Sequence, residues 1–371
     1  MRVESDAGER VEVCLRERSY TIAIGPGLLA ETARQIGHLP SIAHAVVITD
    51  TTVEGLYARQ VADLLRSIVQ RVDLLVVPAG EPSKSVQQAA RLWQEMLDRR
   101  ADRKSLVVAV GGGVVGDLAG FIAATFARGV PLWQVPTTLL AQVDSSVGGK
   151  VGINLPQAKN IVGAFWQPVG VLIDPEVLAT LDDRQYRAGL AEVVKYGVIL
   201  DADFFAYLEA HTDRICQRDS SVLEHVIARC CRLKADVVEQ DEREETGHRA
   251  VLNYGHTFCH ALEAASGYGQ LLHGEAVAIG MLCASRLAER MGRIPVEVTR
   301  RQRDLITALG LSVQMPDLPR QQLVDLMRHD KKVERGELRF VLPTRLGHVE
   351  LVDRVDPRDV LAALEDQGCS E

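Results

Sequence analysis

Three histidines in one short stretch of the chain carry the side chain that most often binds zinc and similar divalent metals. His256 and His260 lie four residues apart, and His273 follows a short loop later. An i, i+4 pair shares one face of a helix, and spacing alone therefore favours His256 with His260. Such a pair is often a coincidence, but His273 strengthens the interpretation as a metal site. Glu192, in another helical stretch, is the best candidate for a completing carboxylate.

A glycine-rich segment, Gly111-Gly112-Gly113-Val114-Val115-Gly116-Asp117, follows an apolar run that is typical of a buried strand and opens a helical pattern. It satisfies G-x-G-x-x-G in the context that this motif needs. Such glycines let the backbone approach a pyrophosphate, whose charge the N–H groups and the helix N-terminus stabilise. The alternative is a tight turn between a strand and a helix.

The nucleotide motif departs from the ordinary dinucleotide fold in one respect. An acidic residue is expected roughly 20 positions after the glycines, where it binds the ribose. That region reads Leu132-Trp133-Gln134-Val135-Pro136-Thr137-Thr138 and contains no acid. Asp50 and Glu81, both upstream, are the candidates instead. We therefore expect a nucleotide site with its own topology.

Basic residues lie among glycines in the next part of the chain, where Lys150 follows Gly148-Gly149 and precedes Lys159 and Asn160. Glycine permits close backbone approach and lysine supplies a point charge, so this segment is a candidate anion cradle. Solvated loop charges are the alternative. Further basic residues fall near the histidines or after the glycine-loop helix: Lys195, Lys234, Arg249, the pair Lys331-Lys332, and Arg128. Metal, nucleotide and anion sites together indicate redox or elimination chemistry on a phosphorylated, hydroxylated small molecule.

Composition limits the class of protein. The chain has 371 residues, of which 47% are hydrophobic and 25% charged, and two globular domains are the natural expectation. The net charge of −8 argues against nucleic-acid binding, which requires an excess of basic surface. No apolar run is long enough to span a bilayer, and residues 1–6 do not resemble a signal peptide. We therefore expect no membrane partner and a cytoplasmic location.

The seven cysteines are odd in number, and no two are spaced as C-x-x-C. We expect them to be reduced, with Cys230, Cys231, Cys259 and Cys283 serving as small core residues in apolar helical surroundings.

The periodicity of apolar residues changes along the chain. Up to about residue 178, short β-rich runs alternate with amphipathic stretches, which predicts an α/β domain with a largely parallel sheet. The expected strands are Val11–Leu15, Tyr20–Ile24, Ala45–Thr49, Leu74–Val77, Leu106–Val110, Leu132–Val135 and Val169–Ile173. The amphipathic stretches between them include Lys84–Leu97 and Val114–Phe126, which we expect to be helices.

Long helical periods dominate after about residue 180. They predict helices at Arg184–Leu200, Ser220–Glu239, His256–Ala265, Gly274–Arg290, Pro295–Leu309 and Gln321–Met327, with a hairpin of Leu338–Leu342 and His348–Val352. We therefore predict an α/β nucleotide-binding domain over residues 1–178 and a mostly helical, metal- and substrate-binding domain over residues 179–371.

Five motifs resemble those of the 3-dehydroquinate synthase family of sugar-phosphate cyclases. They begin at Gly111 (GGGVVGDLAG), Pro136 (PTTLLAQVDSSVGGK), Ala191 (AEVVKYG), Leu252 (LNYGHTF) and His273 (HGEAVA). The resemblance runs from about Tyr20 to Leu364. It implies an N-terminal NAD-binding α/β domain, a C-terminal helical domain, an active site in the cleft, and a homodimer.

The activity implied by this resemblance belongs to the shikimate pathway of aromatic amino acid biosynthesis. 3-Deoxy-D-arabino-heptulosonate 7-phosphate, a phosphorylated sugar acid, becomes 3-dehydroquinate and phosphate. The implied steps are transient oxidation by NAD, β-elimination of phosphate, reduction and intramolecular aldol closure. The resemblance also implies one divalent metal ion, Zn²⁺ or Co²⁺, and an NAD that is regenerated in each cycle.

Residue roles follow from the same motifs. The resemblance implies Glu192, His256 and His273 as metal ligands, which corrects the spacing argument and leaves His260 as a proton-transfer residue near the substrate's phosphate. It implies that substrate is bound by Asp144, Lys150, Asn160, Lys195, Lys234, Arg249, Asn253 and Lys331, with Arg128 reaching the phosphate across a dimer contact. For NAD it implies Asp50, Gly80, Glu81, Lys84, Gly113, Val114, Val115, Gly116, Asp117, Thr137, Thr138, Lys150, Lys159 and Thr180.

Two choices stay open within this resemblance. The run after Lys234 is one residue longer than the common pattern, so Glu244 and Glu245 are both candidates for the acidic neighbour, as are Lys331 and Lys332 for the lysine. Related cyclases such as 2-epi-5-epi-valiolone synthase are the alternative function, and polyol dehydrogenases of similar fold are a second. Lys234, Asn253 and His260 match the dehydroquinate type.

Overall fold

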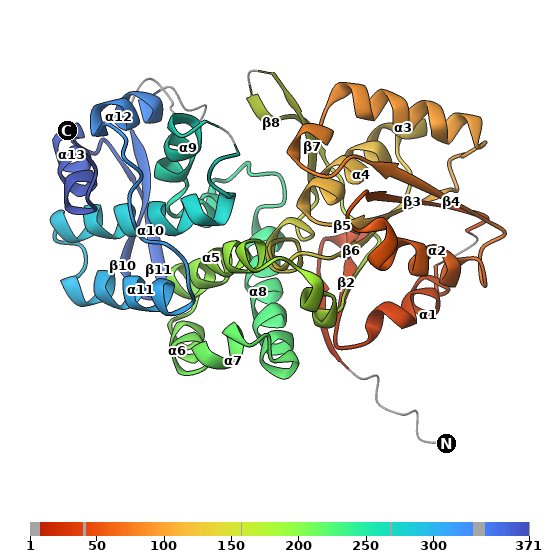
Figure 1. The fold of residues 1–371 in the computed structure, drawn as a ribbon, viewed down its shortest axis with the longest axis horizontal. Helices are drawn as coiled ribbons and strands as arrows, with labels where there is room; N and C mark the ends of the chain where they lie inside the picture. The colour runs from red at the N-terminus through yellow and green to blue at the C-terminus, as the bar shows by residue number, and fades with distance from the viewer. Residues whose placement is uncertain (1–7, 40–41, 157, 268, 329–337, 371) are drawn as a thin grey trace. The chain divides into compact units, whose positions relative to one another are not determined.

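The computed structural model describes residues 8–39, 42–156, 158–267, 269–328 and 338–370 (Figure 1). The chain forms two compact units: the first comprises Met1–Leu181 and Leu223–Arg243, the second Asp182–Val222 and Glu244–Glu371. A segment from the second half of the chain thus groups with the first unit. The domain boundary expected after residue 178 stays a prediction, because compactness does not show which segments fold independently.

The first unit contains a seven-stranded sheet among its described residues, in the order β1-β2-β9-β6-β5-β3-β4. β1 pairs antiparallel with β2, and every other neighbouring pair is parallel. This confirms the predicted α/β class with a largely parallel sheet. The strands are β1 (Glu9–Val13), β2 (Tyr20–Ile24), β3 (His44–Asp50), β4 (Arg71–Val77), β5 (Leu106–Gly111), β6 (Leu132–Pro136) and β9 (Gly170–Ile173).

Helices cover both faces of this sheet (Figure 1). Val46 and Ile48 of β3 pack with helices α3 and α4, whereas Ala45 and Val47 pack on the opposite side with α1 and α2. Strands buried on both faces read as continuous apolar runs, which explains why the sequence revealed them. The helices of this unit are α1 (Thr32–Ile36), α2 (Arg59–Leu65), α3 (Val86–Asp98), α4 (Gly113–Thr125) and, from Leu223 on, α8 (Ser220–Gln240).

A second, two-stranded sheet in this unit was not expected. The segment that the sequence marked as a candidate anion cradle forms a hairpin of β7 (Lys150–Leu155) and β8 (Ala158–Phe165). Much of β8 is exposed, so its sequence lacks the alternation that identifies a half-buried strand. Short 3-10 or π turns of the first unit are η1 (Arg16–Arg18), η2 (Leu28–Glu31), η3 (Glu54–Ala58), η4 (Glu81–Ser83), η5 (Phe126–Arg128), η6 (Ala141–Ser145) and η7 (Pro175–Thr180).

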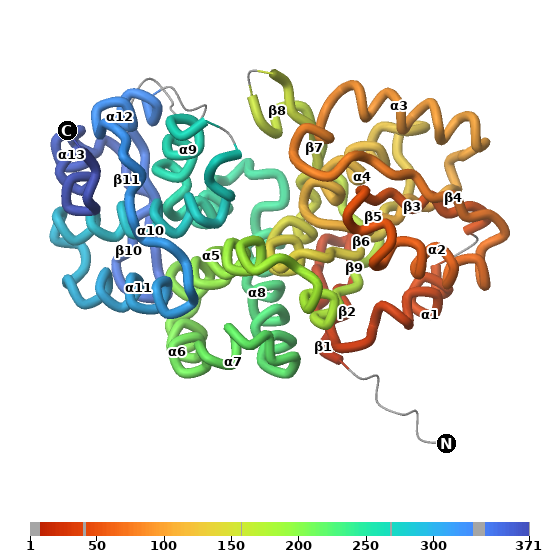
Figure 2. The backbone as a smooth tube through the Cα atoms, in the orientation of Figure 1, coloured from red at the N-terminus to blue at the C-terminus, as the bar shows by residue number. Residues whose placement is uncertain are grey.

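The second unit is mostly helical and is built around α10 (His273–Arg290), which packs against α5, α9, α11, α13 and β10 (Figure 2). Most of α10 is buried, as expected of a helix that is apolar nearly all round. The other elements are α5 (Asp183–Leu200), α6 (Ala202–Ala210), α7 (Thr212–Cys216), η8 (His248–Asn253), α9 (His256–Ala265), α11 (Val296–Ala308), α12 (Arg320–Arg328), β10 (Arg339–Arg345), β11 (His348–Asp353) and α13 (Pro357–Asp366).

The helices carry the cysteines that were expected in the core. Cys230, Cys231, Cys259 and Cys283 are buried and unpaired by disulfides, which confirms them as core residues. No helix within the described ranges is both long and apolar enough to cross a membrane.

Candidate active site

Glu192, His256 and His273 bring a carboxylate and two imidazoles together in the second unit, each offering one ligand atom within 4.8 Å of the others. Glu192 Oε1 lies 3.9 Å from His256 Nε2 and 3.7 Å from His273 Nε2. Three atoms that bind one tetrahedral zinc at about 2.0–2.1 Å lie roughly 3.4 Å from one another. The observed spacing is thus slightly wider than that of a zinc site and leaves room for a divalent ion among the three atoms.

Glycines let the helices that carry these side chains approach closely. A Cβ on Gly274 would overlap the carbonyl oxygen of Ala188 in α5, and one on Gly280 would overlap that of Gly255. The backbone at the start of α10 therefore rests directly on α5, while the middle of α10 rests on the start of α9. This close packing brings the three ligand candidates together from three separate helices.

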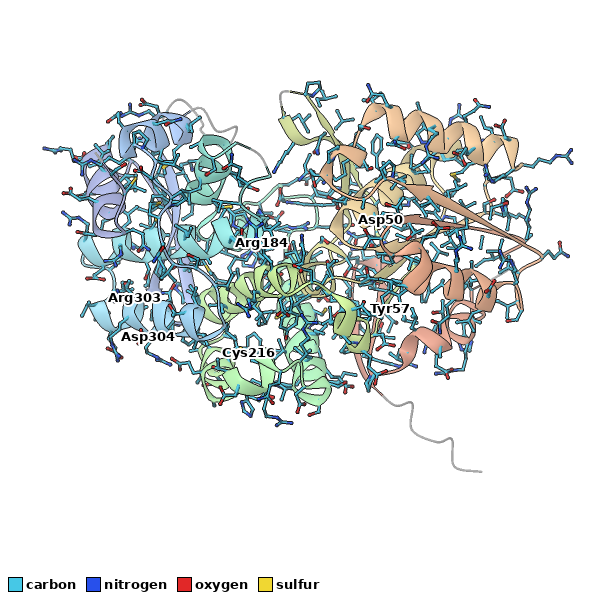
Figure 3. All side chains as sticks on the ribbon, viewed as in Figure 1. Asp50, Tyr57, Arg184, Cys216, Arg303 and Asp304 are labelled. Carbon is cyan, nitrogen blue, oxygen red and sulfur yellow. The ribbon has the colours of Figure 1, made fainter. Side chains whose placement is uncertain are left out.

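An ion pair ties α5 to α10 beside this contact. Arg184, labelled in Figure 3, donates from Nε and Nη2 to the two carboxylate oxygens of Glu275 at 2.7 and 2.8 Å. Bidentate contacts of this kind fix geometry as well as adding energy. Glu275 also accepts from the backbone N–H of Leu272 at 2.8 Å. The residue before His273 is thereby held in place.

Gly274→Ala is expected to lower the free energy of unfolding by about 1–3 kcal/mol, because the added methyl group forces α10 away from α5. The same displacement should weaken divalent-metal binding, since it separates His273 from Glu192. Chemical denaturation and titration with Zn²⁺ measure the two effects. Gly55→Ala is the control, because a Cβ there meets no atom within 4 Å. A Gly274→Ala variant as stable as the wild type would contradict this account.

The buried carboxylate of Glu192 suits a positive ligand. Its side chain is 1% exposed, and Oε1 accepts no hydrogen bond from the described part of the chain. The Lys195 ammonium, one helical turn later, forms an ion pair with Oε2. Oε1 faces the two imidazoles. The buried negative charge at Oε1 is stabilised only by a cation or by strong hydrogen-bond donors, and a metal ion would supply a positive charge there.

His256 is held in the tautomer that a metal ligand requires. Its Nδ1 lies 3.2 Å from the carbonyl oxygen of Tyr254, which can only accept, so Nδ1 carries the proton and Nε2 keeps its lone pair. Tyr254 is itself anchored, because its buried hydroxyl contacts Gln302 Oε1 at 2.8 Å. The loop before α9 therefore aims Nε2 of His256 at Glu192.

His260 stands apart from this group. Its ring centroid lies 5.8 Å from that of His256 in an edge-on arrangement, and the ligand group of the described residues contains His273 instead. The i, i+4 spacing does place the two rings on the same face of α9. Among the described residues, the ligand atoms that meet His256 come from the facing helices α5 and α10, so the choice of His273 over His260 as a metal ligand stays a prediction.

The glycine loop of the first unit has the geometry of an anion site. A Cβ on Gly112 would lie 2.9 Å from Thr138 Cγ2, and one on Gly116 would lie 2.8 Å from Gln134 Oε1. No side chain of the described residues caps the N-terminus of α4, so its first N–H groups are available to a phosphate. Thr137 Oγ1 is buried and makes no hydrogen bond to any described residue. A dinucleotide phosphate fits this arrangement.

Lys84 joins the glycine-loop helix to the β7–β8 hairpin. Its Nζ lies 2.7 Å from Asp117 Oδ2 and also donates to Asn160 Oδ1. Burial raises the pKa of Asp117, and the Lys84 ammonium opposes that shift. The predicted residues Lys84, Asp117 and Asn160 thus form one cluster.

Asn154 extends this cluster, although the sequence-based set of site residues left it out. Its Nδ2 donates to Glu81 Oε1 at 2.7 Å, and its Oδ1 accepts from the Asn160 N–H at 2.7 Å. Asn160 has φ of 52°, in the left-handed region that asparagine tolerates. The available signal was the place of Asn154 among the glycines and lysines of the hairpin. Lys150 begins β7 and Lys159 lies near the start of β8.

Two further pairs involve predicted substrate residues. In the first unit, Lys234 Nζ lies 2.8 Å from Asp144 Oδ1 and donates to the Asp144 carbonyl. In the second unit, the buried Arg249 has its Nε 3.7 Å from Glu244 Oε1. The structure thus brings Glu244 to Arg249. Asn253 ends the same short helix, η8, that contains Arg249.

The other predicted residues occupy turns and strand ends. Asp50, labelled in Figure 3, ends β3, and its Oδ1 accepts from the N–H groups of Thr52 and Val53 at 2.8 and 3.0 Å. Thr180 Oγ1 lies 2.7 Å from the hydroxyl of Tyr57. Gly80 and Arg128 have positive φ, of 102° and 70°. Lys331 and Lys332 lie outside the described residues.

Comparison with known proteins decides the family. The model described as 3-dehydroquinate synthase N-terminal matches residues 74–188, and the one described as 3-dehydroquinate synthase C-terminal matches residues 189–333. The chain belongs to the 3-dehydroquinate synthase family. Among curated relatives, the 3-dehydroquinate synthase of Desulforamulus reducens is 50% identical over 355 residues, which are 95% of this chain and 99% of the relative. The resemblance inferred from the motifs is confirmed.

Solved structures of related cyclases have the same fold as this 3-dehydroquinate synthase family member. The 2-epi-5-epi-valiolone synthase of Streptomyces hygroscopicus, with NAD⁺ and Zn²⁺ bound, is 31% identical with a TM-score of 0.86, covering 95% of this chain and 98% of its own. A 2-deoxy-scyllo-inosose synthase complexed with carbaglucose-6-phosphate, NAD⁺ and Co²⁺ is 27% identical, also with a TM-score of 0.86, covering 96% of this chain and 100% of its own.

Proposed function

We propose that this chain is an NAD- and metal-dependent 3-dehydroquinate synthase, a carbon–oxygen lyase that releases phosphate from 3-deoxy-D-arabino-heptulosonate 7-phosphate. The observation that carries the proposal is 50% identity to a curated 3-dehydroquinate synthase along nearly the whole chain. Similarity to the valiolone-forming cyclase is lower, at 31%. The clustering of Glu192, His256 and His273 supports the same conclusion.

Glu192, His256 and His273 would hold one divalent ion, Zn²⁺ or Co²⁺. Such an ion polarises a substrate hydroxyl and lowers its pKa. NAD would be held by the glycine loop at the start of α4 together with Asp50, Gly80, Glu81, Lys84, Thr137, Thr138, Lys150, Lys159 and Thr180, and it supplies a hydride acceptor that is restored in each cycle.

The chain's own polar residues would bind and orient the substrate. Lys150, Asn160, Arg249 and Lys331 hold the phosphate and carboxylate, because these ionised groups need charged donors in a protein whose net charge is −8. Asp144, Lys195, Lys234 and Asn253 position the hydroxyl groups. His260 accepts or returns a proton near the departing phosphate. Arg128 reaches the phosphate of a second copy in the expected homodimer. Both the homodimer and the cytoplasmic location stay predictions.

Phosphate should accumulate during turnover without net formation of NADH, because one bound NAD is reduced and reoxidised in each cycle. A phosphate-release assay with the heptulosonate phosphate, run beside absorbance at the reduced-nicotinamide band, measures both quantities. A chelator should stop phosphate release, and added Zn²⁺ or Co²⁺ should restore it. Steady NADH production that matches substrate loss would point to a polyol dehydrogenase instead.

A further inference from the structure

A second side of His273 faces two buried residues of α9. Its Nδ1 lies 3.7 Å from Glu263 Oε1 and 3.8 Å from Cys259 Sγ, whereas its Nε2 faces Glu192. Cys259 Sγ is also 3.9 Å from Glu263 Oε2. Glu263 is 8% exposed and Cys259 is 0% exposed. The imidazole of His273 therefore lies between two carboxylates, one at each ring nitrogen.

Helix geometry explains why these two residues meet His273. Cys259 and Glu263 are four residues apart and share one face of α9. The close approach of Gly255 to Gly280 presses α9 against α10, which His273 begins. That packing buries the Glu263 carboxylate beside Nδ1. A carboxylate buried at this depth is stabilised by groups that donate hydrogen bonds to it.

The tautomer of His273 decides whether Nε2 can bind a metal ion. A neutral imidazole has one N–H, and a ligand that binds through Nε2 must carry that hydrogen on Nδ1. A carboxylate facing Nδ1 accepts this hydrogen, fixes the ring orientation and makes Nε2 a stronger donor. Glu263 faces the ring nitrogen that this arrangement requires.

We propose that Glu263 is a positioning residue that holds His273 in the Nδ1–H tautomer and aims its Nε2 toward Glu192 and His256. Cys259 fills the space beside the carboxylate and donates its S–H to Oε2. The inference rests on the proposed function, because it assumes that His273 binds the metal. Cys259, Glu263 and His273 could also form a metal group of their own. That arrangement would bridge two ions through a single imidazole that had lost both its ring protons, so we favour the positioning role.

Glu263→Gln should weaken Zn²⁺ binding by about 10- to 100-fold, because the amide no longer offers a carboxylate to Nδ1. Competition between the protein and a chromophoric chelator for Zn²⁺ measures the affinity. Glu289→Gln is the matched control, since it makes the same Glu-to-Gln change near the end of α10. Glu289 belongs to neither ligand-capable group of the described residues. Equal Zn²⁺ affinity of Glu263→Gln and the wild type, at equal thermal midpoints, would overturn the proposal.

Two further measurements separate positioning from loss of structure. In the wild-type protein without metal, long-range ¹H–¹⁵N spectra of labelled histidines should show a proton on Nδ1 of His273, assigned by its disappearance in His273→Gln. An Nε2–H tautomer without a proton on Nδ1 would contradict the proposal even if Glu263→Gln failed to fold. In Co²⁺-loaded protein, Glu263→Gln should alter the visible absorption bands while Glu289→Gln leaves them unchanged.

Stoichiometry and a His273 variant distinguish the ways in which the inference could fail. One Zn²⁺ per chain is expected, whereas two per chain, falling to one in Cys259→Ala, would favour a second metal site. Unchanged Zn²⁺ binding in His273→Ala would contradict the metal site that the proposed function assigns. Loss of Zn²⁺ binding in His273→Ala, with full Zn²⁺ binding in Glu263→Gln, would contradict only the role of Glu263.

Discussion

Replacing His273 by alanine is expected to abolish stoichiometric metal binding, because the site then retains only Glu192 and His256 of the three proposed ligands. Metal content measured after gel filtration, together with Zn²⁺ titration, gives the result directly. Activity should be lost with the metal. The effect should be larger than that of Glu263→Gln, which keeps all three ligands in place.

His260→Ala is the matched comparison, because it removes an imidazole from the same region without touching the ligand group. It should retain one metal ion per chain and lose most of its turnover, since His260 is assigned to proton transfer and not to the metal. If His260→Ala releases the metal while His273→Ala keeps it, the ligand assignment is wrong and the spacing argument from His256 and His260 was right.

Arg249→Ala is expected to weaken binding of the heptulosonate phosphate by about tenfold or more. A charge-assisted contact to an ionised group contributes roughly 1.5–3 kcal/mol, and about 1.4 kcal/mol corresponds to a factor of ten. NAD affinity should stay nearly unchanged. Binding of substrate and of NAD by calorimetry measures both, and the thermal midpoint checks that loss of this buried side chain leaves the fold intact. Arg303→Ala, at the exposed position labelled in Figure 3, is the control.

The proposed role of Arg249 also predicts the choice of substrate. Sedoheptulose 7-phosphate lacks the carboxylate that Arg249 and its neighbours are proposed to bind, so the wild-type protein should turn it over poorly. Parallel assays of phosphate release from the two sugar phosphates test this. Efficient cyclisation of sedoheptulose 7-phosphate, without activity on the carboxylated substrate, would support a 2-epi-5-epi-valiolone synthase instead.

Local patterns in the sequence were enough to predict most of the secondary structure. The central strands β3 and β5 are buried on both faces, so each appears as an apolar run bounded by polar residues or glycine. The glycine loop and the long helices of the second unit follow equally local rules. The β7–β8 hairpin escaped prediction because much of β8 is exposed and does not alternate.

The candidate ligands were also visible in the sequence, but their grouping was not. Residue type made Glu192, His256, His260 and His273 candidates for metal binding, and motif resemblance chose among them. Periodicity alone favoured His256 with His260, since it describes one helix at a time. Convergence depends on how α5, α9 and α10 pack, which Gly255, Gly274 and Gly280 decide by allowing their backbones to touch.

The sequence by itself determined the fold class, the nucleotide loop and the chemistry available at the histidines, because each depends on residue type and on neighbours within a few positions. Only the tertiary structure decided which side chains share a site. Asn154 contacts Glu81, Lys84 joins Asp117 to Asn160, and Glu263 faces Nδ1 of His273. The first three of these contacts join residues 33 to 76 positions apart. Such pairings depend on backbone packing between elements, and no periodicity within a single element encodes them.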